Sequence, residues 1–173
     1  MDQRTALQTE RLVLRPLTPD DIPDIVAGLN DYDVSKWLTV VPYPYTPADA
    51  AEFLTHLETR GAFDGFGLTR DGGPVMGVVG IDNSLGYWLA RAHHGHGYMS
   101  EAAKALVGHW FTATGADALT SGHFEGNVAS ASILAKLGFR HTHDEQVTSR
   151  AQGKAVTIHQ MRLARHDWAR SDG

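Results

Sequence analysis

Two glycines, Gly95 and Gly97, stand just before a segment whose apolar residues recur at helical spacing from about Ser100. The N-terminus of a helix offers unpaired backbone N–H groups and a partial positive charge, and glycines there let the chain wrap an anion without side-chain clashes. A strand, a glycine turn and a helix in this order indicate a phosphate or pyrophosphate site, although the turn is equally compatible with a structural role alone. Ser100 replaces the third glycine of a dinucleotide fingerprint, and the Gly-Lys-Ser/Thr of a nucleoside-triphosphate loop is absent.

Ten histidines are the other residues whose side chains could bind a metal or transfer protons. His93, His94 and His96 lie close together, and His141 and His143 form a second group, so a metal site is a competing interpretation. Neither group fits the helical His-Glu-x-x-His pattern, and no acidic ligand stands at a diagnostic spacing from them. We therefore expect no metal.

Length and composition are those of one domain over residues 1–173, since 42% of the 173 residues are hydrophobic and 20% are charged. No run approaches the roughly 20 consecutive apolar residues of a membrane span. The segment 1–5 lacks the apolar stretch of a signal peptide. We expect a cytoplasmic protein that binds no membrane.

The absence of cysteine and the acidic charge balance exclude several function classes. Without cysteine there is no disulfide, thiolate metal site, iron–sulfur cluster or cysteine nucleophile, so any catalysis must use oxygen and nitrogen groups. A formal net charge of -5 argues against a general nucleic-acid surface, which needs clustered Lys and Arg.

The spacing of apolar residues predicts a mixed α/β fold, with a largely antiparallel sheet flanked by helices in the order βααβββαβαββ. Two helix starts are marked by Thr18-Pro19 and Thr46-Pro47, each an N-cap residue followed by proline. Asp71-Gly72-Gly73 is typical of a hairpin turn. The predicted strands cover residues 11–15, 66–68, 75–81, 85–89, 117–124, 143–149 and 156–163, and two further helices cover about 100–112 and 128–137.

Four segments resemble motifs of the GNAT N-acetyltransferases, and most closely those of the RimJ/RimL-like branch. They are Leu-Gly-Tyr-Trp-Leu at 85–89, Gly-His-Gly-Tyr-Met-Ser-Glu-Ala at 95–102, Asn-Val-Ala-Ser at 127–130 and Lys-Leu-Gly-Phe at 136–139. Segments 11–17 and 161–163 fit as well, so the resemblance covers nearly the whole chain. It implies a GNAT-like fold and an enzyme that moves acetyl from acetyl-CoA to a primary amine by direct attack in a ternary complex.

The resemblance places coenzyme A along a strand end, the glycine turn and the helices that follow. The family's pyrophosphate loop falls on residues 94–99, where His94 replaces a Gln or Arg and Met99 replaces a small residue; the backbone N–H groups survive both changes. Asn127 would hydrogen-bond the pantetheine arm. Lys136 is a candidate for phosphate contact, because Ser132 stands where relatives often carry Arg. The implied cofactor-binding residues are Trp88, Leu89, His94, Gly95, His96, Gly97, Tyr98, Met99, Ser100, Asn127, Ser130 and Lys136.

The proton-transfer residues of the family are only partly matched. Leu134 stands where many members carry the Tyr that protonates the thiolate, and resemblance to RimL-like enzymes gives this task to Ser130, with a helix-start hydroxyl as the alternative. No acid stands near Ser149, where that branch offers a carboxylate. The candidates for the general base are therefore His123, whose side chain type titrates near neutral pH, and Glu125.

The acceptor pocket is expected opposite the coenzyme A arm, with Trp37, Tyr43 and Tyr45 as lining residues by family analogy; core packing is the alternative for Trp37. The acceptor would be a peptide N-terminus or a small-molecule amine, and the protein a monomer or homodimer that binds no nucleic acid. The missing Tyr and carboxylate also leave open a non-catalytic module that binds coenzyme A as a regulator or scaffold.

Overall fold

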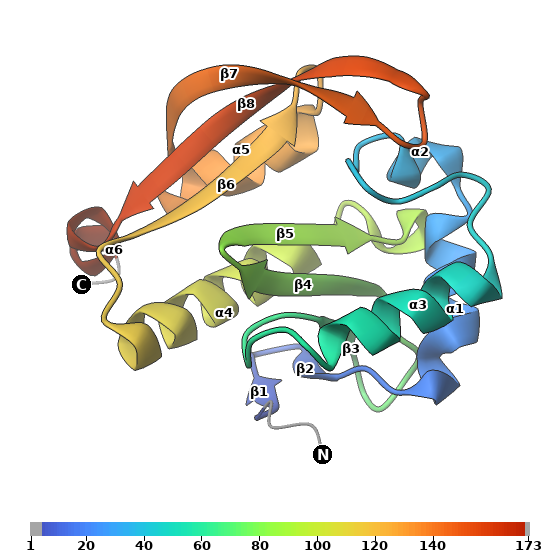
Figure 1. Cartoon of the computed structure of the whole chain (residues 1–173). Helices are drawn as coiled ribbons and strands as arrows, with labels where there is room; N and C mark the ends of the chain where they lie inside the picture. The colour runs from blue at the N-terminus through green and yellow to red at the C-terminus, as the bar shows by residue number, and fades with distance from the viewer. Residues whose placement is uncertain (1–4, 172–173) are drawn as a thin grey trace.

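The computed structural model describes residues 5–171, in which one mixed sheet is flanked by helices (Figure 1). The strands lie in the order β1-β2-β3-β4-β5-β6-β8-β7, and every neighbouring pair is antiparallel except β5 and β6. The strands are β1 (Leu7–Gln8), β2 (Val13–Pro16), β3 (Phe66–Thr69), β4 (Gly77–Asp82), β5 (Ser84–Leu89), β6 (Ala118–Phe124), β7 (Arg140–Ser149) and β8 (Lys154–Ala164). The helices are α1 (Ile22–Leu29), α2 (Tyr32–Ser35), α3 (Pro47–Leu57), α4 (Tyr98–Thr114), α5 (Val128–Leu137) and α6 (Arg165–Ser171), with 3-10 turns at Pro19–Asp21 and Arg91–His93.

The predicted mixed α/β fold with a largely antiparallel sheet is confirmed. The predicted elements occur in the predicted order, and the structure adds β1, α2 and α6. With two residues in β1 and four in α2, those elements are too short to show a periodic pattern. The segment after Thr18 also differs in detail, because a 3-10 turn precedes the α-helix that starts at Ile22.

Residues 1–4, on which the expected lack of a signal peptide partly rested, lie outside the described range. Across residues 5–171, none of the helices combines the length and the apolar character that a bilayer crossing requires.

Local hydrogen bonds explain why α3 starts where the sequence indicates. The Thr46 hydroxyl accepts from the Asp49 N–H at 3.2 Å, and the Asp49 carboxylate accepts from the Thr46 N–H at 2.8 Å. This reciprocal capping satisfies two backbone donors, and Pro47 occupies the first helical position, where its missing N–H costs nothing. The helix therefore begins at a position set by its own residues.

Two apolar layers cover the two faces of the central strands. Adjacent residues of a strand point to opposite faces, and on β4 Val79 packs in the layer with α4, whereas Val78 packs with α1 and α3. The same alternation continues on β5, where Tyr87 pairs with Val79 and Trp88 pairs with Val78. Tyr87 and Trp88 are consequently directed to opposite sides of the sheet.

The β7–β8 hairpin extends from β6 and reaches the segment that follows α2 (Figure 1). At its tip, the Arg150 N–H donates to the Thr39 carbonyl at 3.0 Å, and the Gln152 side chain donates to the Lys36 carbonyl at 2.7 Å. These bonds fix residues 36–39 against the hairpin, although the two segments lie more than a hundred residues apart in the chain. The hairpin thus positions one wall of the site described next.

Candidate active site

A deep cleft opens where β5 and β6 separate. The two strands are paired at Ser84 and Thr120, near their starts, and β6 climbs away from β5 beyond this point (Figure 1). The buried Ser121 hydroxyl donates to the Leu85 carbonyl at 2.8 Å and bridges the strands where they begin to part. The resulting cavity has a volume of about 1100 Å³. A space of this size accommodates an extended ligand together with a second reactant.

The outer edge of β5 borders this cavity with unpaired backbone. Residues from Gly86 to Leu89 pair with β4 on one side, and no register with β6 continues on the other. An exposed strand edge presents N–H and C=O groups to an extended partner. One of these groups is already used, because the His94 imidazole donates from Nε2 to the Leu89 carbonyl at 2.7 Å. His94 therefore ties the glycine turn to the strand end.

The glycine turn leads directly into α4 at the same cavity. Gly95 and Gly97 have φ angles of 83° and 77°, in the left-handed region that glycine adopts without the penalty of a Cβ. Gly97 is the N-cap of α4, so the N–H groups of the first helical turn have no intrahelical partner. The cavity is lined here by Gly95, Gly97, Tyr98, Met99 and Ser100. This geometry favours an anionic group at the helix start.

His96, by contrast, is not among the residues that line the cavity. Its carbonyl accepts from the Arg11 guanidinium at 2.9 Å, and its ring stacks on Tyr98 with centroids 5.3 Å apart. His96 thereby braces the turn from outside.

The same brace includes Glu101 in the first turn of α4. Its carboxylate accepts from the Thr9 hydroxyl at 2.6 Å and from the Arg11 Nε at 2.9 Å. Burial raises the pKa of Glu101, but these hydrogen bonds outweigh the burial and leave its pKa below the ordinary value. Glu101 is thus an ionised group that fixes the start of α4.

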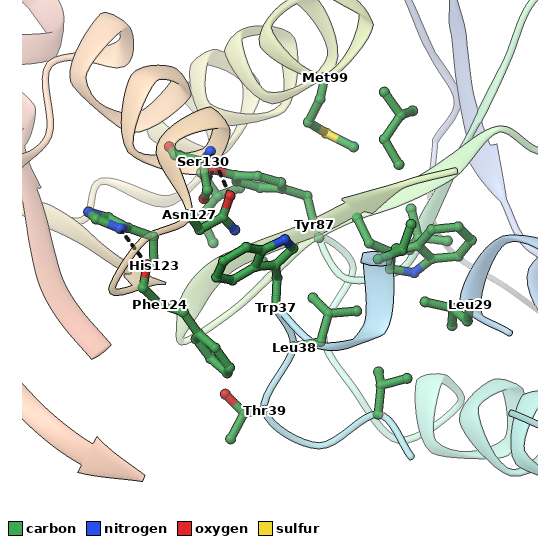
Figure 2. A pocket seen from close by; sticks show the side chains of 18 of the residues that line it. Leu29, Trp37, Leu38, Thr39, Tyr87, Met99, His123, Phe124, Asn127 and Ser130 are labelled. Carbon is green, nitrogen blue, oxygen red and sulfur yellow. Dashed lines mark hydrogen bonds between the residues drawn. The ribbon is translucent and has the colours of Figure 1, made fainter. Parts of the chain in front are cut away.

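The start of α5 brings three polar side chains together. Figure 2 shows Asn127, Ser130 and Tyr87 around one point of the cavity. The Asn127 side chain caps α5 by accepting from the Ser130 N–H at 3.3 Å, and the hydroxyls of Tyr87 and Ser130 lie 2.8 Å apart. Burial raises the pKa of Tyr87 to about 12, against a smaller lowering by the Ser130 hydrogen bond. Tyr87 therefore stays protonated near neutral pH and can donate to Ser130.

Tyr87 belongs to the motif at 85–89, but the sequence alone indicated no role for it. The motif places Tyr87 on a strand next to the cofactor edge, and the alternation of that strand directs it to the side of α4 and α5. The hydroxyl contact with Ser130, 43 residues away, depends on how α5 packs. The signal available in the sequence was a tyrosine in the strand motif, together with Leu134 at the position where many family members carry the Tyr that protonates the thiolate.

The two candidates for the general base differ in their access to the cavity. His123, near the end of β6, is half-buried and belongs to the lining. Its Nδ1 lies 3.2 Å from the Phe124 carbonyl, an interaction in which the ring nitrogen donates (Figure 2). Glu125 is exposed and lies outside the lining residues. His123 therefore borders the cavity and Glu125 does not, but the β6–β8 register directs the His123 ring to the face of His159, opposite the face of Phe124.

The expected acceptor residues also differ in whether they line the cavity. Trp37 and Tyr45 line the cavity, and Figure 2 shows Trp37 entering the space near Asn127 and Phe124. Tyr45 is almost fully buried, and burial raises its pKa to about 12. Tyr43 is 43% exposed, packs edge-on against Tyr32 and is outside the lining residues. Of the three expected residues, only Tyr43 is not among those that line the cavity.

The far part of the expected cofactor path lies on α5. Lys136 and Ser132 are exposed and line the cavity, so a cation is available near the helix. Trp88 and Leu89 line it from β5, as expected for the strand beside the cofactor.

Comparison with known proteins assigns the class of this site. The family profile described as acetyltransferase (GNAT) domain matches residues 11–140, well over half of the chain. The chain therefore belongs to the GNAT acetyltransferases, and it is an acetyltransferase by family.

Among curated proteins, the chain is similar to the uncharacterized N-acetyltransferase p20 of Bacillus licheniformis, with 25% identity over 94% of this chain and 98% of the relative. Among solved structures, it is similar to RimJ of Mycobacterium smegmatis in complex with a coenzyme A disulfide, with a TM-score of 0.82, 18% identity and coverage of 95% and 90% of the two chains. It is also similar to RimL, the ribosomal L7/L12 α-N-protein acetyltransferase, in complex with coenzyme A, with a TM-score of 0.79, 17% identity and coverage of 92% and 98%. These likenesses confirm the fold and the RimJ/RimL-like resemblance.

Proposed function

We propose that the protein transfers an acetyl group from acetyl-CoA to a primary amine by direct attack in a ternary complex. The observation that carries this proposal is the meeting of three features in one cavity. They are the glycine turn at the start of α4, the unpaired edge of β5, and the Tyr87–Ser130 hydroxyl pair. The first suits a pyrophosphate, the second an extended amide-bearing arm, and the third a leaving thiolate.

In this proposal, the N–H groups at the start of α4 hold the pyrophosphate, and the backbone of Gly86–Leu89 pairs with the pantetheine arm. Asn127 is the further contact for the arm, and Lys136 supplies charge for a phosphate. His94 and Met99 replace residues common in the family, but neither change removes a backbone N–H from the helix start. The residues present therefore fit coenzyme A.

For the chemical step, His123 takes the proton that the amine loses as its nitrogen bonds to the thioester carbonyl carbon. The carbon–sulfur bond then breaks, and Ser130 gives its hydroxyl proton to the leaving sulfur. Tyr87 donates a hydrogen bond to the Ser130 oxygen as that oxygen gains negative charge, and Ser130 recovers a proton through water. The proton count is balanced, because one proton leaves the amine and one arrives on the thiol.

We propose a peptide N-terminus as the acceptor, with a small-molecule amine as the other candidate. RimL is described as an acetyltransferase of the α-amino group of ribosomal L7/L12, and a structurally similar Vibrio fischeri protein is described as a ribosomal-protein-S5-alanine acetyltransferase, with a TM-score of 0.73, 18% identity and coverage of 95% and 98%. The cavity wall of Trp37 and Tyr45 offers apolar surface for the residues that follow the amine.

The cofactor part of the proposal is tested by titrating acetyl-CoA into wild type, Gly97→Ala and Gly115→Ala. Gly97 and Gly115 cap the two ends of α4, with φ angles of 77° and 66°, so alanine introduces comparable strain of about 1–2 kcal/mol at both. We expect Gly97→Ala to weaken binding by about tenfold or more, because it displaces the N–H groups at the cavity. Gly115→Ala should bind as wild type, and equal weakening by both variants would contradict the assignment.

The activity is then tested by following free thiol release with short peptides that differ in their first residues, and with diamines as small acceptors. Turnover of a peptide that stops when its N-terminus is blocked supports the proposal. Tight acetyl-CoA binding without turnover of any amine would instead favour the non-catalytic, coenzyme A-binding alternative.

A further inference from the structure

The β7–β8 hairpin gathers a group of ligating side chains that the acetyl-transfer site does not use. His141 and Asp144 lie on β7, and His159 lies opposite Asp144 on β8. His141 pairs with Met161, and the register then shifts, so that His143 pairs with Gln160. The shift is a β-bulge that contains one extra residue on β7.

This bulge decides which side chains share a face. Residues three apart in a regular strand point to opposite faces, so His141 and Asp144 would be separated. The extra residue restores them to one face, together with His159. His143 and Glu145, which pair with each other at 2.9 Å, lie on the other face of β7. Their cross-strand neighbours, Gln160 and Ile158, line the cavity.

The three side chains already converge on one point. Asp144 Oδ1 lies 2.7 Å from His141 Nε2 and 2.7 Å from His159 Nδ1, and the three ligand atoms all lie within 4.8 Å of one another. Ligand atoms of a tetrahedral zinc site, with bonds of about 2.0–2.2 Å, are separated by about 3.3–3.6 Å. Small side-chain rotations are therefore sufficient to place an ion among them.

We propose that His141, Asp144 and His159 bind a divalent first-row transition metal, for which Zn²⁺ is the natural probe. Two imidazoles and a carboxylate are ligands that zinc accepts, whereas Mg²⁺ and Ca²⁺ prefer sets of oxygens. His141 and Asp144 are about half exposed and His159 is 26% exposed, so the ion can enter and water can complete its coordination.

Local spacing gave no reason to expect this site. The sequence offered His141 with His143, but the structure pairs His141 with a carboxylate and with an imidazole from the next strand. His123 stands beside the group, with its ring centroid 5.1 Å from that of His159, while its Nδ1 faces the Phe124 carbonyl. The ion would join β7 to β8 at the end of the hairpin remote from Arg150 and Gln152.

The test is calorimetric titration of Zn²⁺ into protein prepared without a histidine tag and treated with chelator. The variants are His141→Ala, His159→Ala and Asp144→Asn, with His143→Ala as the matched control from the same strand and the opposite face. We expect one ion per chain in wild type and in His143→Ala, and binding weakened by about tenfold or more in each of the other three.

Two further readouts separate a lost ligand from a lost fold. Without metal, the variants at the exposed positions 141, 143 and 144 should have melting temperatures similar to that of wild type. Added Zn²⁺ should raise the melting temperature of wild type and His143→Ala only. Co²⁺ should give the visible absorption of a low-coordinate site in the same two proteins. Absence of saturable binding, or equal loss in His143→Ala, would overturn the proposal and leave a hydrogen-bonded surface triad.

Discussion

Replacing Tyr87 by Phe removes a single hydroxyl from the site and keeps the buried ring. In the structure this hydroxyl lies 2.8 Å from Ser130 Oγ. As Ser130 passes its proton to the leaving sulfur, its oxygen gains negative charge, and a hydrogen bond to a charged group contributes about 1.5–3 kcal/mol. At about 1.36 kcal/mol per factor of ten, Tyr87→Phe should lower kcat about 10- to 150-fold.

The assay is steady-state thiol release with saturating acceptor, together with single-turnover measurements that isolate the chemical step. The KM for acetyl-CoA should change little, because the contact strengthens only in the transition state. Ser130→Ala should lower kcat by about 10²- to 10⁴-fold, the range for a general acid. In the double variant, the loss should equal that of Ser130→Ala alone, since Tyr87 acts through Ser130.

A double variant whose losses multiply would refute the coupling between the two residues. So would a Tyr87→Phe variant with unchanged single-turnover rate and only a lower melting temperature, because that outcome describes a packing role. The raised pKa of Tyr87, about 12, also predicts that its titration contributes no limb to the pH–rate profile between about pH 6 and 9.

Two other changes test the base and the scaffold. His123→Ala should lower kcat/KM about 100-fold across roughly pH 6–8, and full activity over that range would exclude it as the base. Asp21→Asn should lower the free energy of unfolding by about 2 kcal/mol near pH 7, because the buried Asp21 accepts two hydrogen bonds from Arg15, at 2.9 and 2.8 Å. Burial raises the pKa of Asp21, but Arg15 and Thr18 outweigh it and hold the pKa below 3.8, so this stabilisation is present above about pH 4 and is lost as pH falls through the lowered pKa. Denaturant unfolding should therefore show the gap between wild type and Asp21→Asn closing only below about pH 4, and a gap independent of pH would contradict the assignment.

Several parts of the fold were predictable because short-range rules decide them. The helix that begins at Pro47 is fixed by Thr46 and Asp49, which cap it within four residues. The left-handed conformation of Gly115 and Gly138 follows from helix C-termini, which glycine ends without the penalty of a Cβ. The glycine turn before α4 indicated an anion site from local sequence as well, because glycines there leave the N–H groups of the helix start accessible.

Other parts depended on contacts between distant segments. The alternating pattern of β5 does not predict that this strand separates from β6 after Ser84. That separation depends on the packing of α4 and α5 against the two strands. The partner of Glu101 is Arg11, 90 residues away. Tyr43, predicted at the acceptor site with its neighbours, packs edge-on against Tyr32 and is not among the residues that line the cavity.

The sequence by itself thus determined the order of elements, the helix starts and the family motifs, because each is encoded by neighbours in the chain. Only the tertiary structure brought Tyr87 to Ser130 and placed His159 beside His141 and Asp144. Both groupings rest on register and helix packing, which sum many weak contacts over the whole chain. Loss of the bulge between His141 and His143, or a small rotation of α5, would separate these side chains without altering any motif.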